Sequence, residues 1–293
     1  MESLAREIGA ACRNVGFLYL VNHGVATATI EAALSAMREF FAQPVEAKRR
    51  VAMKKSASGI RGYFGLGEED LDDKIDGVGT PTKGDWKEGF DCGCDVEALE
   101  KQSPLVDDNQ WPSPEFRDPV MAYQRAVLGV AARLMTAFAI ALDVPAEFFV
   151  DRTKRPLATL RLLHYPPSVG LGSGAHTDYG CCTILYQDGV GGLEVKLGDD
   201  WVPVPPARDA FVVNIGDMMH RWTNGRFAST LHRVRANPTS HRYSLPLFFN
   251  PDIGVRVECL PTCCDEDHPP RYESALAEDL LLQRYRATFR HIH

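Results

Sequence analysis

Three side chains of metal-binding type lie in two short segments in the second half of the sequence. His176 and Asp178 stand two residues apart in the first segment, residues 174–180. On a β-strand, side chains at this spacing project from the same face, so the two are expected to converge on one point. His232, in an apolar segment further on, can supply a third ligand from another strand. Two histidines and one carboxylate on one face of an octahedron leave three positions open, as non-haem iron(II) oxygenases require.

Neither the His176–Asp178 pair nor His232 is a specific sign of a metal site by itself. His-x-Asp pairs are common, and a single histidine such as His232 is more often a surface or core residue. Zinc is the alternative metal, although a purely structural zinc site normally fills all four positions with protein ligands, often cysteines. The interpretation as an iron site therefore depends on a second group of residues.

That second group is Arg242 and Ser244, on the predicted strand that follows His232. The two side chains again share a face, and a guanidinium fork beside a hydroxyl suits a bound carboxylate. The alternative is that Arg242 pairs with an acidic side chain of the protein itself instead of a ligand. With the candidate iron ligands upstream, the carboxylate of 2-oxoglutarate is the better candidate.

The elements that must position these residues change character at Pro156. Before it, apolar residues at helical spacing predict helices over 4–15, 29–41 and 118–142, and Asp118-Pro119 is expected to cap and begin the third. Loops and short strands are expected from about 56 to 117. After Pro156, apolar runs separated by glycine and proline predict a sandwich or barrel. The expected strands are 157–165, 181–187, 192–196, 210–215, 231–235 and 242–250, followed by a helix over 273–289.

Composition narrows the class of protein. The 293 residues are 45% hydrophobic and 24% charged, which is ordinary for a globular chain long enough to bury a substantial core. The net charge of −7, without a dense basic run, argues against nucleic acid and anionic membranes as partners. We divide the chain into an N-terminal helical and loop region, 1–117, and a second part, 118–293, with the β core at about 155–255.

The cysteines and the start of the chain favour a soluble, cytoplasmic protein. The eight cysteines do not make the paired spacing of a zinc site, and a disulfide framework belongs to shorter secreted chains. The first residues lack the apolar run of a signal peptide. No stretch approaches the roughly 20 apolar residues that span a bilayer. We therefore expect reduced thiols.

With His-x-Asp, the later histidine and Arg-x-Ser in this order, the chain resembles the isopenicillin N synthase-like family of 2-oxoglutarate/iron(II) dioxygenases. Further blocks similar to the family run in order through nearly the whole chain. They are NVGFLYLVNHGV at 14–25, RGY at 61–63, DWKE at 85–88, LEV at 193–195, VNIGD at 213–217, WTNGR at 222–226 and LHRV at 231–234.

The resemblance implies a mainly β fold, a double-stranded β-helix (jelly roll) with flanking α-helices. It implies iron(II) at His176, Asp178 and His232, and the distal carboxylate of 2-oxoglutarate at Arg242 and Ser244. O₂ is then the oxidant, and ascorbate is a candidate reductant. The family's tyrosine that helps to bind the cosubstrate matches Tyr165.

Two features depart from the family. Family members usually have an extra strand before the first helix, whereas this chain begins at the helix, so its start is either truncated or unusual. The family's Asn-Tyr-Tyr-Pro is replaced here by Leu-His-Tyr-Pro at 163–166. A cosubstrate role is therefore in doubt for the residues that precede Tyr165.

The implied activity is oxidation of an unactivated C–H bond of a small organic molecule, with release of succinate and CO₂, by an enzyme that we expect to be a monomer. Hydroxylation, desaturation and oxidative cyclisation all stay open. Alternation along the strands makes Arg161 a candidate to pair with an acidic substrate and Phe248 a candidate pocket wall, and Tyr63 is a candidate lid residue. An oxidase of the same family that does not consume 2-oxoglutarate is the alternative, and a non-catalytic metal-binding sensor is the alternative of a different class.

Overall fold

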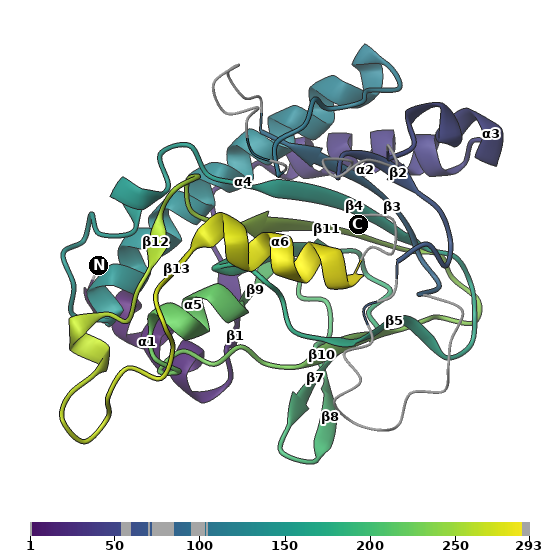
Figure 1. Ribbon diagram of the computed structural model, residues 1–293. Helices are drawn as coiled ribbons and strands as arrows, with labels where there is room; N and C mark the ends of the chain where they lie inside the picture. The colour runs from purple at the N-terminus through teal and green to yellow at the C-terminus, as the bar shows by residue number, and fades with distance from the viewer. Residues whose placement is uncertain are drawn as a thin grey trace.

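Two antiparallel β-sheets form the framework of the molecule. The computed structural model describes residues 2–53, 60–69, 71, 85–94, 103 and 105–288 (Figure 1). The larger sheet has the order β1 (Phe17–Val21), β9 (Ala210–Ile215), β6 (Cys182–Gln187), β11 (Arg242–Phe249), β4 (Thr159–Tyr165), β3 (Glu88–Gly93), β2 (Gly62–Phe64). The smaller sheet has the order β5 (Leu171–His176), β10 (His232–Arg235), β7 (Leu193–Leu197), β8 (Asp200–Pro203). This is the predicted jelly roll.

Helices cover the outer face of the larger sheet. The cover is made by α1 (Glu2–Asn14), α2 (Thr27–Phe41) and α4 (Pro114–Ala141), and both α1 and α2 pack against α4. The other elements are α3 (Val45–Lys48), η1 (Arg49–Val51), η3 (Val150–Arg152), α5 (Asp217–Trp222), β12 (Arg256–Val257), η4 (Pro261–Cys263), β13 (Ala275–Leu276) and α6 (Ala277–Thr288). In Figure 1, α6 crosses in front of the larger sheet near α5.

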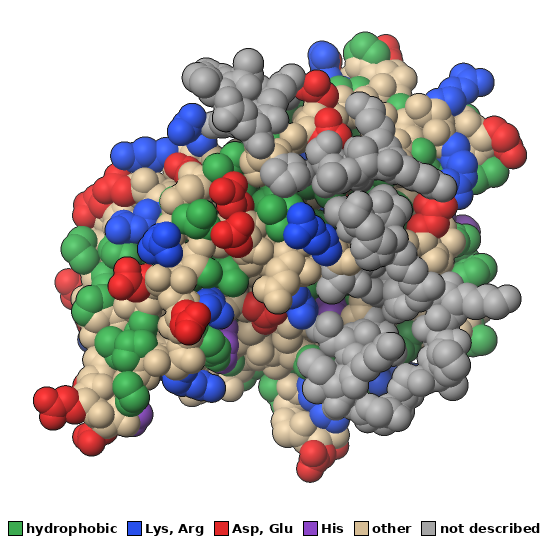
Figure 2. Space-filling view, viewed as in Figure 1, with side chains coloured by type: hydrophobic (Ala, Val, Ile, Leu, Met, Phe, Trp, Pro, Cys, Tyr) green, Lys and Arg blue, Asp and Glu red, His purple; other side chains and the backbone are tan. Residues whose placement is uncertain are grey.

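Charged side chains of both signs are interspersed over the described part of the face in Figure 2. No extended patch of lysine and arginine is visible there. All eight cysteines are free thiols, as the sequence predicts.

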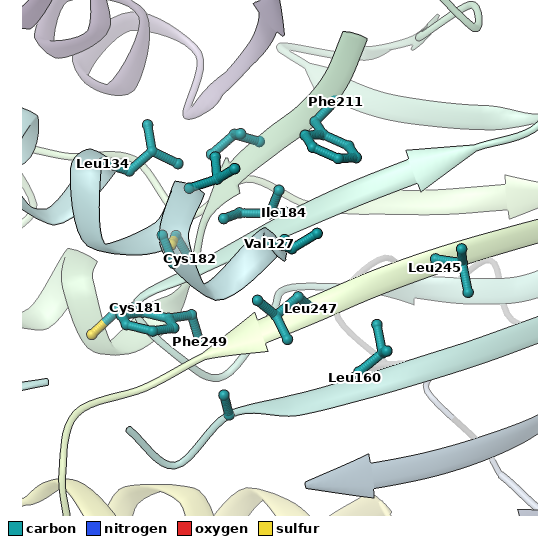
Figure 3. Packing of buried hydrophobic residues seen from close by; sticks show 14 of the residues in the cluster. Val127, Leu134, Leu160, Cys181, Cys182, Ile184, Phe211, Leu245, Leu247 and Phe249 are labelled. Atoms are coloured by element: carbon teal, nitrogen blue, oxygen red, sulfur yellow. The ribbon is translucent and has the colours of Figure 1, made fainter. Parts of the chain in front are cut away.

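The main hydrophobic core lies between α4 and the outer face of the larger sheet. Figure 3 shows Val127 and Leu134 of α4 beside Ile184 of β6 and Leu247 of β11. By length and hydropathy α4 could cross a membrane, so the expectation that no stretch approaches such a span is wrong. Its apolar residues are instead used for this core, where Val127 is fully buried.

Alternation along β4 and β11 sends one set of side chains to this core and the other set between the two sheets. Leu160 and Leu162 face the helices, whereas Leu163 and Tyr165 belong to a second apolar cluster inside the jelly roll. The two strands are paired with Arg242 opposite Tyr165. The period of two that the sequence analysis used is therefore confirmed on the strands that face the interior.

Two helices begin four residues away from the predicted start. The long helix begins at Pro114, because Ser113 caps it by accepting a hydrogen bond from Phe116 N at 3.3 Å. The sequence offers two similar pairs, Ser113-Pro114 and Asp118-Pro119. The helix begins at the first pair, so the predicted start at the second is wrong, and Pro119 lies inside the helix. The last helix begins at Ala277 instead of residue 273, because Ala275–Leu276 first pairs with β12.

Gly16 lies two residues beyond the end of the first helix. It has φ +74°, a conformation that glycine adopts without strain, and a Cβ at this position would lie 2.0 Å from the carbonyl oxygen of Ala228. The chain can therefore turn from α1 into β1 while touching the segment that leads to β10.

Candidate metal centre and adjoining cavity

The three candidate ligands meet at one end of the smaller sheet. His176 is the last residue of β5, and His232, the first of β10, is its direct partner in the register of the two strands. Asp178 Oδ1 lies 3.8 Å from His176 Nε2 and 3.7 Å from His232 Nε2. Among the residues that the structure describes, this is the only group of three or more potential metal ligands whose atoms lie within 4.8 Å of one another.

The convergence of His176 and Asp178 has a different origin from the predicted one. Strand β5 ends at His176, so Asp178 lies in the turn that follows and not on the same strand face. This turn is held by a hydrogen bond from Asp217 N to Asp178 O at 2.7 Å, at the start of α5. The backbone turn, not strand alternation, brings the carboxylate back towards the imidazoles.

Hydrogen bonds leave one atom of each candidate ligand available. His176 Nδ1 lies 2.8 Å from Gly174 O and His232 Nδ1 lies 3.1 Å from Thr230 O, so each Nδ1 carries the proton and donates it. Asp178 Oδ2 accepts hydrogen bonds from the Thr183 hydroxyl and from Asn214 Nδ2. The two Nε2 lone pairs and Asp178 Oδ1 are thus oriented before any ion binds.

The protonation states also suit a metal. Burial, and then the nearby His232, hold the pKa of His176 well below its usual value. Burial acts to raise the pKa of Asp178, but the two histidines and the donated hydrogen bonds outweigh it, so this pKa lies below its usual value. Neutral imidazoles and an ionised carboxylate are the forms that bind metal ions. Two nitrogens and one oxygen with no thiolate among them match iron(II) of the non-haem oxygenases.

Arg242 lies in a cavity that adjoins the three ligands. Its guanidinium donates to Ser244 Oγ at 3.2 Å and to Gln187 Oε1 at 3.3 Å, while its buried Nε has no hydrogen-bond partner. The side chain is 2% exposed, and no described carboxylate lies within ion-pair distance of it. Among the described residues, the alternative that Arg242 pairs with an acidic side chain of the protein is therefore not supported. A buried, unpaired cation is costly unless a ligand brings the anion, and the carboxylate of 2-oxoglutarate fits that need.

Tyr165 lies under the same guanidinium. The Arg242 guanidinium carbon is 4.8 Å from the centre of the tyrosine ring, and both residues line the cavity with His176 and His232. The ring rests on Gly172 of β5, where a Cβ would lie 2.6 Å from Tyr165 Cδ1. The structure thus brings the predicted cosubstrate residues to one wall.

Four contributing residues were not found by sequence reasoning. Gln187, Thr183 and Asn214 are buried polar residues within apolar strands, and that unusual placement was the available signal. Gly172 lies in Leu-Gly-Ser-Gly-Ala-His, which lacks the apolar alternation of a strand, so nothing indicated its contact with Tyr165.

The three candidate substrate residues have different outcomes. Phe248 lines the cavity, as predicted. Arg161 also lines it, but its Nε and Nη2 are paired with Asp91 and its Nη1 with Glu69, so the expected pairing with an acidic substrate is not supported. The lid assignment of Tyr63 is wrong, because this residue is 2% exposed on β2 and donates its hydroxyl proton to Glu88 at 2.6 Å.

Replacing Thr183 with valine is expected to lower the affinity for a divalent metal. The change removes one of two side-chain donors that hold Asp178 Oδ2, and loss of such a supporting contact typically costs about 10- to 100-fold in metal affinity. Calorimetric titration with Mn²⁺ would measure it. Thr223→Val is the matched control, since it removes an equally buried hydroxyl that contacts Met219 O. Equal affinities of the two variants would contradict the supporting role.

Comparisons with known proteins agree with this geometry. Residues 1–114 match the family model described as non-haem dioxygenase in morphine synthesis N-terminal, and residues 157–251 match the 2OG-Fe(II) oxygenase superfamily. The 2-oxoglutarate-Fe(II) type oxidoreductase hxnY of Emericella nidulans is 33% identical over 98% of this chain and 85% of its own length. The 2-oxoglutarate-dependent dioxygenase caaD of Aspergillus niger is 36% identical over 86% of this chain and 79% of its own.

Solved structures show the same likeness. A 2OG-Fe(II) oxygenase family protein from Caulobacter crescentus superposes with a TM-score of 0.86 at 32% identity, covering 98% of this chain and 94% of its own. A full-length Neurospora crassa protein in complex with α-ketoglutarate gives a TM-score of 0.82 at 27% identity, covering 97% and 89%. The chain therefore belongs to the 2-oxoglutarate/iron(II)-dependent oxygenases, enzymes that use iron(II), 2-oxoglutarate and O₂.

Proposed function

We propose that His176, Asp178 and His232 hold the iron(II) of this oxygenase, and that Arg242, Ser244 and Tyr165 hold 2-oxoglutarate beside it. The observation that carries the proposal is the pairing of two prepared sites in one cavity. Three ligand atoms point at a common position, and a buried arginine without an acidic partner among the described residues lies on the adjoining wall. When bound, the metal and cosubstrate would supply the oxidising chemistry: one oxygen atom of O₂ enters succinate as CO₂ is released, and the other enters the oxidised substrate or leaves as water.

The residues of the chain position and enclose this chemistry. Arg242 and Ser244 fix the distal carboxylate by charge-assisted hydrogen bonds, which sets the direction in which 2-oxoglutarate reaches the metal. Leu163, Leu185 and Val234 line the same cavity and exclude water from it. Holding the reactants together in a dry cavity is the main contribution of a protein to such a reaction.

The candidate substrate space adjoins this cavity and shares His176, Asp178 and Phe248 with it. Tyr179, Phe248, Leu281 and Tyr285 line it together with His176 and Asp178, and the last two of these wall residues come from α6. A small organic molecule with a C–H bond near the metal is the substrate that this space supports. The Neurospora crassa protein of similar fold has also been solved with thymine, and JOX2 with JA.

We expect a monomer in the cytoplasm that binds neither nucleic acid nor membranes. The net charge of −7 and the interspersed charges in Figure 2 support the expectation about nucleic acid and membranes, because nucleic acid and anionic lipid are bound by concentrated positive charge.

A substrate screen by succinate formation tests the function. The purified protein, with Fe²⁺, 2-oxoglutarate and air, is expected to release succinate faster with a substrate than without one. Mass analysis then identifies the reaction, since a gain of one oxygen atom means hydroxylation and a loss of two hydrogen atoms means desaturation or ring closure. Iron-dependent product formation without succinate would instead identify an oxidase that does not consume 2-oxoglutarate.

A further inference from the structure

A chain of five buried charges of alternating sign runs beside the substrate space. In order of contact its members are Asp85, Lys87, Glu69, Arg161 and Asp91, called here the charge chain. The four contacts are 2.6 Å from Asp85 to Lys87, 2.9 Å from Lys87 to Glu69, 2.7 Å from Glu69 to Arg161, and 2.7 Å from Arg161 to Asp91. All five residues are buried. They come from β3, β4 and two connecting segments, so the chain exists only in the folded protein.

The two cations of the charge chain are satisfied by the protein itself. Lys87 Nζ donates hydrogen bonds to Asp85 Oδ2 at 2.6 Å and to the Ser173 hydroxyl at 3.0 Å, and it also forms an ion pair with Glu69. Arg161 uses Nε and Nη2 for both oxygens of Asp91 and Nη1 for Glu69. Burial acts to raise the pKa of Glu69, but Arg161 and Lys87 outweigh it and lower this pKa to about 2. Glu69 therefore stays ionised between its two partners.

The charge chain faces the bound molecules. Glu69 and Arg161 line the substrate space together with His176, Asp178 and Phe248. A third buried cation, Arg61, lies near the end of the chain: burial raises the pKa of Asp91, and Arg161 and Arg61 both act to lower it. Three carboxylates therefore have three cations close to them. In that space an anionic substrate would meet Arg161, which already has two acidic partners, and a cationic substrate would meet Glu69, which is already paired with Arg161 and Lys87.

Arg242 provides the contrast within the same cavity. Where the proposed function places a carboxylate, the described residues leave a buried arginine without an acid. At the substrate end, Arg161 is equally buried but is paired twice. Because a buried charge must be compensated either by the protein or by a ligand, the two arginines indicate ligands of different charge.

We propose that the substrate space selects an uncharged, largely apolar molecule. This inference rests on the proposed function, since it concerns the substrate of the same metal centre. The aromatic and aliphatic walls, Tyr179, Phe248, Leu281 and Tyr285, supply the apolar contacts. The charge chain excludes charged analogues by leaving them without a free counter-charge.

Three probes with one skeleton and different charge test the selection. Phenylacetamide is neutral, phenylacetate is an anion and phenethylamine is a cation at neutral pH. Equilibrium dialysis without oxygen, with Fe²⁺ and 2-oxoglutarate present, is expected to show the amide bound at least about tenfold more tightly than either ion, because unfavourable juxtaposed charges cost more than one decade of affinity. Equal retention of all three, including no retention, or tighter binding of an ion would overturn the proposal.

A charge-neutral replacement tests the assignment to the charge chain. Glu69→Gln keeps the shape but removes the charge between Lys87 and Arg161, so the preference for amide over phenylacetate is expected to fall by at least about tenfold. Glu69→Asp keeps the charge and should keep the exclusion of phenylacetate. Glu194→Gln is the matched control, because Glu194 also contacts two arginines, at 2.6 and 3.1 Å, and lines neither part of the cavity. An unchanged preference in folded Glu69→Gln would overturn the assignment.

Retention of 2-oxoglutarate in the same dialysis distinguishes failure of the proposed function from failure of the selection of uncharged substrates. If the wild-type protein retains no 2-oxoglutarate in the dialysis, the proposed function is refuted. Retained 2-oxoglutarate together with preferred binding of an ion would refute only the selection of uncharged substrates.

Discussion

Asp178→Ala is expected to abolish iron-dependent turnover. The substitution removes the only anionic ligand of the proposed centre and leaves two neutral imidazoles, which cannot balance the charge of a divalent cation. It also leaves the Thr183 hydroxyl and Asn214 Nδ2 without the oxygen that they share. Succinate formation with and without added Fe²⁺ measures the loss, and full retained activity would rule out Asp178 as a ligand.

A thermal measurement distinguishes a lost ligand from a damaged fold. A metal that binds only the folded state raises the unfolding temperature, by an amount that depends on its concentration relative to its dissociation constant. The wild-type protein is expected to show this rise with Mn²⁺, and Asp178→Ala is expected to show none. Asp252→Ala is the control, because Asp252 accepts a hydrogen bond from Arg155 N at 2.7 Å and lines neither part of the cavity. It should keep both the metal-dependent rise and turnover.

The interior face of the β core could be predicted from local pattern alone. Alternation from Tyr165 gives Leu163 and Arg161, and alternation from Ser244 gives Pro246 and Phe248, and all of these line the cavity. The pattern succeeds because each of these strands is paired on both sides within the larger sheet, so its side chains must alternate between two buried faces.

Local pattern failed where a long-range partner decides the role of a residue. Arg161 was expected to bind an acidic substrate, but its acids, Glu69 and Asp91, lie 92 and 70 positions away in the sequence. Tyr63 was expected in a lid, but its hydroxyl donates a hydrogen bond to Glu88 on the neighbouring strand and its ring packs against Phe40. Partners at such distances are set by sheet order, which no short window of sequence contains.

The edge strand of the smaller sheet, β5, was also not predicted from the local pattern of apolar residues. Strand β5 has few apolar residues and is held by its pairing with β10, with irregular register between His232 and Arg235. Gly172 allows the close approach of Tyr165, and His176 is the last residue of the strand, opposite His232. The ligand spacing His-x-Asp was thus recognised for the right residues, although a turn and not a strand face brings them together.

Arg242→Ala is expected to raise the requirement for 2-oxoglutarate by at least tenfold. Removing the arginine leaves the bound carboxylate without its counter-charge, which costs about 2–5 kcal/mol. That cost corresponds to a dissociation constant weaker by roughly 30- to 3000-fold. Arg242→Lys keeps the charge but loses the fork and its position over Tyr165, so an intermediate effect is expected. The rate of succinate formation at increasing 2-oxoglutarate concentration measures all three proteins, and an unchanged requirement would refute the role.

The same variant should separate stability from binding. Because Arg242 is buried without an acid among the described residues, the protein without 2-oxoglutarate bears the cost of an uncompensated cation, and alanine relieves it. We therefore expect the ligand-free unfolding temperature to change little, while the rise produced by 2-oxoglutarate with Mn²⁺ is lost. A structural arginine would behave in the opposite way, with a large fall in ligand-free stability and an unchanged response to 2-oxoglutarate. The comparison thus tests whether Arg242 serves to bind 2-oxoglutarate and lowers the stability of the ligand-free protein.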